Sequence, residues 1–177
     1  KLVAMITFGI EGLGAVLLAL RFAVDFPWGT AVYYGIFHAI SAFNNAGFAL
    51  FSDSFKSYQT DETINGIITI LVIFGSIGFL VFEDLLDNIR GLRFRVQTHT
   101  KLVIVTTSIL IVVGTLGITI LEWNNPSTFH SSSIGEKLTI SYFHAVNRTA
   151  GFTSIDIVDM RDATLYFLLL LMAIGGS

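Results

Sequence analysis

The sequence contains no cysteine and little charge. Its 177 residues include two prolines, 10 Lys or Arg and 13 Asp or Glu, and the formal net charge is -3. The lack of cysteine excludes disulfides, thiolate metal sites and cysteine nucleophiles. A small negative charge with a single short basic stretch argues against a nucleic-acid partner. A soluble domain would carry more charged residues than this chain does.

Long apolar runs take the place of charge. Hydrophobic residues make up 53% of the chain, and its mean hydropathy is +0.74. Several runs reach about 20 residues, the length that crosses a hydrocarbon core of about 30 Å. The composition therefore predicts an all-α polytopic membrane protein. Because the chain starts without Met, we expect it to be a piece of a longer protein.

The first apolar run, Leu2 to Ala23, predicts a membrane-spanning helix. Glu11 lies in its middle, where a carboxylate must either line a conduction path or be hydrogen-bonded between helices. A break at residues 25–29 precedes a second run, with Thr30 as the predicted N-cap and Ala31 to Phe43 as the helix. Thirteen residues give a helix of about 20 Å, which is too short to span the membrane. We therefore expect this helix to re-enter the membrane.

Two further runs, Ile64 to Phe82 and Leu102 to Leu121, predict more spans. Glycines in the first of them predict close packing or a bend. Residues 90–100, between the two runs, are expected to form a cytoplasmic loop, because Lys and Arg mark the cytoplasmic side of membrane proteins. The basic residues in and beside this loop are Arg90, Arg93, Arg95 and Lys101.

The C-terminal third predicts another short helix and another apolar run. Ser133 and Glu136 have the spacing of a capping box, which predicts a helix that runs to about Val146. The last apolar run begins at Leu165 and stops after about a dozen residues at Gly175-Gly176-Ser177. This run is shorter than a full crossing, so either the helix breaks there or the sequence ends within it.

The chain thus contains two copies of one unit, in which a span is followed by a short helix, a glycine loop and another span. The loops end in Ala46-Gly47-Phe48 and Ala150-Gly151-Phe152, with glycines 104 residues apart. Phe-His-Ala precedes each loop, but His38 is nine residues before its glycine and His144 is seven before its own. The copies are therefore related without strict register.

Glycine loops after short helices suit a permeating cation. K⁺ gives up hydration water only where several oxygens replace it, and backbone carbonyls do so without a fixed charge that would trap the ion. Gly47 and Gly151 allow backbone angles that turn successive carbonyls toward one axis. The C-terminal ends of the short helices carry partial negative charge, which favours a cation. Two copies in matching contexts are a far more specific signal than one Ala-Gly-Phe.

In the segments Ser41 to Phe48 and Asn147 to Phe152, the sequence resembles the Trk/Ktr/HKT superfamily of K⁺ transporters, in particular the membrane subunit of bacterial Ktr systems. The resemblance covers the whole chain. It implies K⁺ uptake across the cytoplasmic membrane by four membrane–pore–membrane repeats, with residues 1–89 as the second repeat and 101–177 as the third. The implied K⁺ ligands are backbone carbonyls of a filter formed by Asn44, Asn45, Ala46, Gly47, Asn147, Arg148, Thr149, Ala150 and Gly151.

The resemblance also implies regulation and assembly. It places an intramembrane gate loop at Gly175, Gly176 and Ser177, and it implies a homodimer with a cytosolic nucleotide-binding regulatory ring. No organic cofactor is expected on this chain. A Na⁺-permeable or weakly selective transporter and a non-conducting assembly or sensor subunit remain as alternatives.

Other polar residues have simpler explanations. His38 and His144 have no second ligand at metal spacing, so hydrogen-bonded packing roles are expected, and Arg148 is expected to bond the scaffold behind its loop. Ser41 and His38 imitate a nucleophile–base pair, but no third orienting group is evident, so no enzyme is predicted. The acids near the loops either concentrate cations at the mouth or are simply solvated: Asp53, Asp61, Glu62, Asp156 and Asp159.

Overall fold

The computed structural model describes residues 2–89, 96–129 and 133–174, and every regular element within these ranges is helical. The helices are α1 (Leu2–Phe22), α2 (Trp28–Phe43), α3 (Glu62–Ile77), α4 (Phe79–Ile89), α5 (Thr98–Glu122), α6 (Pro126–Phe129), α7 (Ile134–Asn147) and α8 (Asp162–Ile174), with single turns of 3₁₀ helix at Lys56–Tyr58 and Ile157–Asp159.

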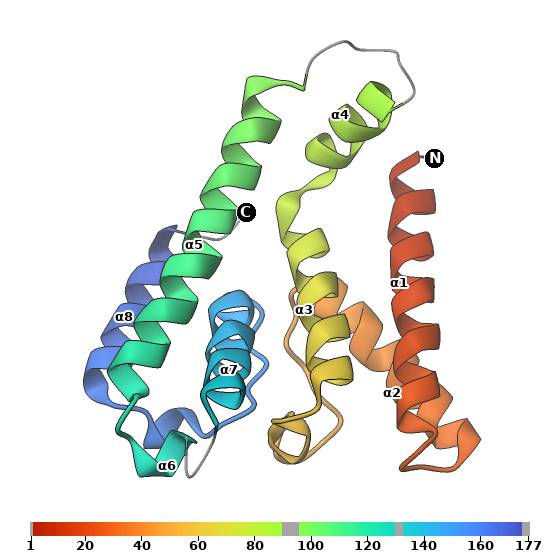
Figure 1. Ribbon diagram of the computed structural model, residues 1–177. Helices are drawn as coiled ribbons and strands as arrows, with labels where there is room; N and C mark the ends of the chain where they lie inside the picture. Colours follow the sequence, from red (N-terminus) through yellow and green to blue (C-terminus); the bar gives the residue numbers. More distant parts are fainter. Residues whose placement is uncertain (1, 90–95, 130–132, 175–177) are drawn as a thin grey trace.

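The helices form two groups that stand side by side, α1 to α4 and α5 to α8 (Figure 1). Within the described ranges, two helices are long and apolar enough to cross a membrane, Val3–Phe22 and Thr98–Glu122, and a third crossing results if α3 and α4 are counted as one bent span. The chain is therefore an all-α polytopic membrane protein, as its composition predicts.

The start of α2 differs from the sequence prediction. The helix begins at Trp28, directly after Pro27, and Thr30 lies inside it, so the prediction of Thr30 as N-cap is wrong. Pro27 precedes the helix with φ -55, and no side chain caps the first turn. Because the proline ring fixes φ near the helical value, the helix can start here without a capping hydroxyl. Sixteen residues give a length of about 24 Å, still short of a crossing.

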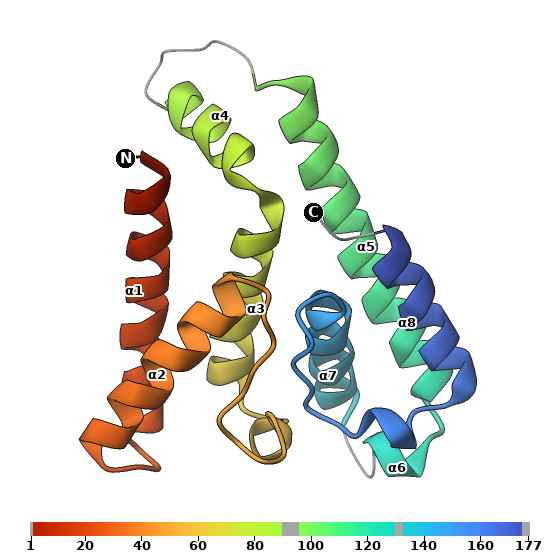
Figure 2. The ribbon, with the colours of Figure 1, turned by 180° about the vertical axis from the view of Figure 1, so that it is seen from behind.

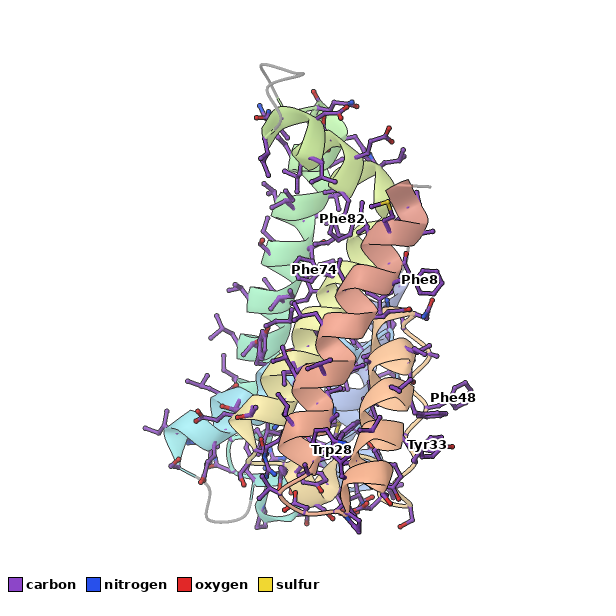
Figure 3. The ribbon with its side chains drawn as sticks, turned by 90° about the vertical axis from the view of Figure 1, so that its right-hand side faces the viewer. Phe8, Trp28, Tyr33, Phe48, Phe74 and Phe82 are labelled. Carbon is purple, nitrogen blue, oxygen red and sulfur yellow. The ribbon has the colours of Figure 1, made fainter. Side chains whose placement is uncertain are left out.

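The span predicted from Ile64 to Phe82 is not one helix. α3 and α4 meet at Gly78 with a bend of 92°, so the predicted bend is confirmed, and the predicted span consists of two helices. Gly78 has φ +85, a value that favours glycine over other residues. The rings of Phe74 and Phe82 pack across the bend, 5.8 Å between centroids (Figure 3).

The second group matches its predictions more closely. α5 extends the predicted span at both ends, and the capping box is present: the Glu136 side chain accepts from the Ser133 amide at 2.7 Å, and the Ser133 hydroxyl accepts from the Glu136 amide at 3.3 Å. α8 begins at Asp162, three residues before Leu165. The predicted gate loop, 175–177, and most of the basic loop, 90–95, lie outside the described residues.

The short helices α2 and α7 occupy one half of the molecule, and the segments that follow them run between the two groups (Figure 2). Aromatic side chains fill the space around these segments. Phe22, Phe55, Phe143 and Phe152 are all buried in one continuous core, which takes residues from both groups. This core fixes the position of the glycine loops.

Candidate functional site

The two glycine loops meet backbone to backbone. Gly47 has φ +68 and Gly151 has φ +96, both in the region that favours glycine. A methyl group on Gly47 would overlap the Ala150 carbonyl oxygen, and a Cβ on Gly151 would lie 3.9 Å from the Gly47 Cα. The fold thus brings together two loops that the sequence separates by about a hundred residues.

Most loop carbonyls are free of backbone partners. Among the described residues, no backbone N–H donates to the carbonyls of Asn44, Asn45, Ala46, Arg148, Thr149 or Ala150. The Asn147 carbonyl differs, because it accepts from the amides of Ala150 at 3.1 Å and Gly151 at 2.9 Å. A carbonyl without a partner is costly in an apolar environment unless water or an ion meets it. The two loops therefore offer several oxygens that a bound cation would satisfy.

The first loop is held by the end of its own helix. The Ser41 carbonyl accepts from the Ala46 amide at 2.8 Å, and the Ser41 hydroxyl donates to the Phe48 carbonyl at 2.8 Å. The Asn44 side chain donates to Glu11 at 2.8 Å. Glu11 is buried, so of the two roles predicted for it the structure supports a carboxylate hydrogen-bonded between helices.

His38 and His144 are buried and hydrogen-bonded, as the sequence predicts. The His38 Nδ1 lies 2.7 Å from the Tyr34 carbonyl oxygen and therefore carries the proton, which leaves Nε2 to accept from the Leu50 amide at 3.2 Å. The His144 Nε2 lies 3.4 Å from the Ser154 amide. Each histidine thus ties its short helix to the segment that follows its glycine.

Arg148 also bonds the scaffold. Its guanidinium donates to the Ala145 carbonyl at 2.9 Å, at the C-terminal end of α7. Arg148, Asn45 and Thr149 line a cavity of about 440 Å³ between α3, α5 and α7, to which Ile174 at the end of α8 also contributes. The cavity therefore lies beside both glycine loops and reaches the last described turn of α8.

The geometry does not favour a hydrolase. Both ring nitrogens of His38 are engaged with backbone groups, and the Ser41 hydroxyl donates to Phe48 rather than to the imidazole. A nucleophile requires a base within hydrogen-bond reach of its hydroxyl. Within the described ranges, no group of three His, Asp or Glu side chains is placed to hold a metal ion.

Several acids near the loops have structural partners. Asp61 caps α3 by accepting from the Ile64 amide at 2.9 Å, and it also pairs with Arg21 at 2.5 Å. Asp156 pairs with Lys56. The Ser57 hydroxyl donates to Asp53 at 2.7 Å, which lowers the pKa of that carboxyl. These three acids are therefore more than solvated loop residues.

Two buried side chains are missed by sequence reasoning. Glu122, at the end of α5, is fully buried and accepts hydrogen bonds from α6 and from the start of α8. Phe55 lies in a polar stretch but is also fully buried, between the two groups of helices. A single acid at the end of an apolar run, or a single Phe in a loop, gives no local signal of such a role.

The sequence profile of one protein family, TrkH, described as a cation transport protein, matches residues 1–177. The chain is 44% identical over 178 residues to Ktr system potassium uptake protein B of Bacillus subtilis (strain 168), covering 100% of this chain and 40% of that protein. It is 39% identical over 177 residues to the protein of the same name from Vibrio alginolyticus, covering 98% of this chain and 39% of that protein.

A third relative has a broader name. The chain is 36% identical over 169 residues to potassium/sodium uptake protein NtpJ of Enterococcus hirae, covering 95% of this chain and 37% of that protein. The chain spans about two fifths of the length of these curated relatives. All three relatives are named as uptake proteins and none as an enzyme.

Proposed function

Because the chain belongs to the TrkH family of cation transport proteins, we propose that it forms part of the conduction path of a K⁺ uptake protein. The observation that carries the proposal is the backbone contact of two glycine loops, each with its glycine at positive φ. Names of relatives as potassium uptake proteins support K⁺ as the ion.

The filter in this proposal consists of backbone oxygens. The carbonyls of Ala46 and Ala150 stand directly before the two glycines and have no backbone partner among the described residues. We assign them as ion ligands together with those of the neighbouring residues, Asn44, Asn45, Arg148 and Thr149. The Asn147 carbonyl is the weakest member of the predicted set, because two amides of its own loop already occupy it.

The rest of the path lies partly outside this chain. Two loops do not enclose an ion, so the proposed filter needs two further loops from the remainder of a longer protein or from a second copy. The repeat positions, the homodimer, the cytosolic nucleotide-binding ring and the cytoplasmic membrane belong to this proposal. So does the gate loop at 175–177, which in the sequence directly follows Ile174, a residue that lines the cavity.

A weakly selective transporter is the second candidate. The observation in its favour is a relative named as a potassium/sodium uptake protein, which is 36% identical to this chain. Selectivity depends on the number and field strength of the coordinating oxygens, and one glycine per loop is compatible with both ions. Measurement of Na⁺ and K⁺ uptake side by side separates these two candidates.

The test uses the full-length transporter in liposomes. Gly47→Ser and Gly151→Ser are expected to reduce K⁺ uptake or K⁺/Na⁺ discrimination by about tenfold or more, because a side chain at positive φ costs about 1–3 kcal/mol and displaces the carbonyls. Gly47→Ser should be the more damaging, since its side chain would also overlap the Ala150 carbonyl.

Gly135→Ser is the matched control, because Gly135 lies exposed in the first turn of α7. It should transport at the wild-type rate. Wild-type rates and selectivity in both loop variants would contradict the proposed filter. A wild-type protein that moves neither K⁺ nor Na⁺ would favour a non-conducting assembly or sensor subunit.

A further inference from the structure

A short segment of the first group of helices bonds to the segment that follows the second glycine loop. The Phe55 amide donates to the Thr153 carbonyl at 2.9 Å, and the Thr153 amide donates to the Ser54 hydroxyl at 3.2 Å. Lys56 pairs with Asp156 beside them. We call these five residues the interloop clasp. Both backbone groups of Thr153 are therefore held by the other group of helices.

Ser54 has an unusual conformation that this contact explains. Its φ is +56, which few residues other than glycine adopt. A backbone in this region costs about 1–2 kcal/mol for a residue with a Cβ. In exchange, the Ser54 hydroxyl and the Phe55 amide face the same residue, Thr153. A strained backbone conformation of this kind persists only where the surrounding contacts hold the residue in it.

The Phe55 ring extends the clasp into the core. The side chain is fully buried, and its ring centroid lies 5.1 Å from that of His38 and 5.3 Å from that of Phe152. His38 holds Leu50, three residues after Gly47, and Phe152 directly follows Gly151. Phe55 thus touches the support of the first loop and an immediate neighbour of the second glycine.

These contacts make one continuous path between the loops. It runs from Leu50 through His38 to Phe55, and from Phe55 to Thr153, which is two residues from Gly151. Two extended residues span only about 7 Å, so little slack remains between the clasp and the second glycine. His144 holds Ser154 from its own helix. The segment after Gly151 is therefore fixed on both sides.

We propose that the interloop clasp sets the spacing between the two filter loops, which makes Ser54 and Phe55 positioning residues for ion selectivity although neither lies in a glycine loop. This inference rests on the proposed function. Discrimination between cations depends on where the coordinating oxygens stand and how strongly they hold the ion. A contact that fixes two loops relative to each other thereby acts on the ion without touching it.

The test is the ratio of K⁺ to Na⁺ uptake rates of the full-length transporter in liposomes. Ser54→Gly removes the hydroxyl and keeps a residue that accepts positive φ, and it is expected to lower the ratio about fivefold, the change that one hydrogen bond corresponds to. Ser54→Asn should restore the ratio toward wild type, because Asn tolerates the same backbone and offers an amide oxygen to Thr153.

Two more variants separate the clasp from general damage. Ser57→Ala removes a hydroxyl from the neighbouring 3₁₀ turn, Lys56–Tyr58, that among the described residues bonds only to Asp53, and it should leave the ratio unchanged. Phe55→Leu keeps a buried apolar side chain but loses the ring contacts with His38 and Phe152, and it should lower the ratio. Gel filtration and thermal melting in detergent establish that each variant is folded.

The outcomes distinguish the two proposals. Folded Ser54→Gly and Phe55→Leu proteins with the wild-type ratio would overturn the clasp as a determinant of selectivity. If Gly47→Ser lowers the ratio while these clasp variants do not, only the clasp is wrong. If Gly47→Ser and Gly151→Ser also keep the wild-type rate and ratio, or if the wild-type protein moves no K⁺, the filter and the clasp are both wrong.

Discussion

His38 and His144 do the same work from different positions along the chain. Each accepts a backbone N–H from the residue three places after the glycine of its loop, Leu50 in one case and Ser154 in the other. Their distances before the glycines differ by two residues. The two units therefore share the backbone amide that is bonded, three residues after the glycine, but the histidine that accepts from it stands at a different position in each short helix.

A neutral acceptor at His38 is predicted to be required for the first loop. His38→Leu leaves the partly buried Leu50 amide without its imidazole partner, which costs about 1–3 kcal/mol, and should lower both the melting temperature and K⁺ uptake. His38→Gln retains an acceptor and should recover part of both. The measurements are thermal melting in detergent and uptake in liposomes.

His99→Leu is the matched control for this prediction, because His99 lies exposed at the start of α5. It should leave the melting temperature near the wild-type value. A His38→Leu protein that melts and transports like wild type would show that the Leu50 hydrogen bond does not support the loop.

At the scale of residues, the sequence predicts the role of the two loop glycines but not the side chains that hold the loops in place. Gly47 and Gly151 stand out because the pattern around each is local and occurs twice. The partners of His38 lie four residues before it and twelve after it, and the second of these becomes a neighbour only when the loop folds back. Phe55 shows the same limit, since its neighbours come from both groups of helices.

At the scale of helices, one carboxylate in each group fastens the end of a long helix to the start of a later one, α1 to α3 in the first group and α5 to α8 in the second. In the first group, Asp61 caps α3 and pairs with Arg21 of α1. In the second group the direction is reversed, because Glu122 of α5 accepts from the Arg161 amide at 2.9 Å and from the Thr164 hydroxyl at the start of α8. The carboxylate thus comes from the start of the later helix in the first group and from the end of the earlier helix in the second.

Glu122→Gln is predicted to loosen α5 from α8. The Glu122 oxygens accept from four groups, two hydroxyls, an amide side chain and a backbone amide, and a glutamine would turn an NH₂ toward some of these donors. The loss is expected to be about 2–3 kcal/mol of stability, since hydrogen bonds to a charged group are the stronger ones. Thermal melting of the full-length protein measures it.

Glu62→Gln serves as the control for this change, because Glu62 lies exposed in the first turn of α3 and should cost only a fraction as much. Equal shifts in melting temperature for the two variants would contradict a special role for Glu122.

Prediction of the elements succeeds where the signal is local. Apolar length predicts α1 and α5, and the capping box predicts the start of α7. It fails at Thr30, because Pro27 starts α2 without a capping hydroxyl. Gly78 illustrates an intermediate case, since a glycine permits both close packing and a turn, and only the packing around it decides for a 92° bend.

At the scale of the molecule, the basic loop predicts which side of the membrane each end faces. Because this chain contains no cysteine, single cysteines in a cysteine-free full-length protein report on orientation. Val158→Cys, at a residue 92% exposed beyond the second glycine loop, should react with an impermeant thiol reagent added to intact cells. His99→Cys, near the basic loop, should react only after permeabilisation. The opposite pattern would reverse the predicted topology.

One outer face of the α1–α4 group carries large apolar side chains that have little cover. Phe8, Tyr33 and Phe48 project from α1, α2 and the first glycine loop (Figure 3), and each is more than half exposed. Phe152, which follows the second glycine as Phe48 follows the first, is buried. The two loops therefore have different neighbours within this chain although both end in Ala-Gly-Phe.

The contact between Gly47 and Ala150 also constrains how such a chain can evolve. Duplicated units usually drift apart by exchanging side chains at their interface, where a loss on one side is compensated by a gain on the other. Here one backbone rests on another, and a side chain at Gly47 would overlap the opposing carbonyl. No compensating substitution is available at that point, so divergence between the two units is expected to accumulate in their helices and outer turns instead.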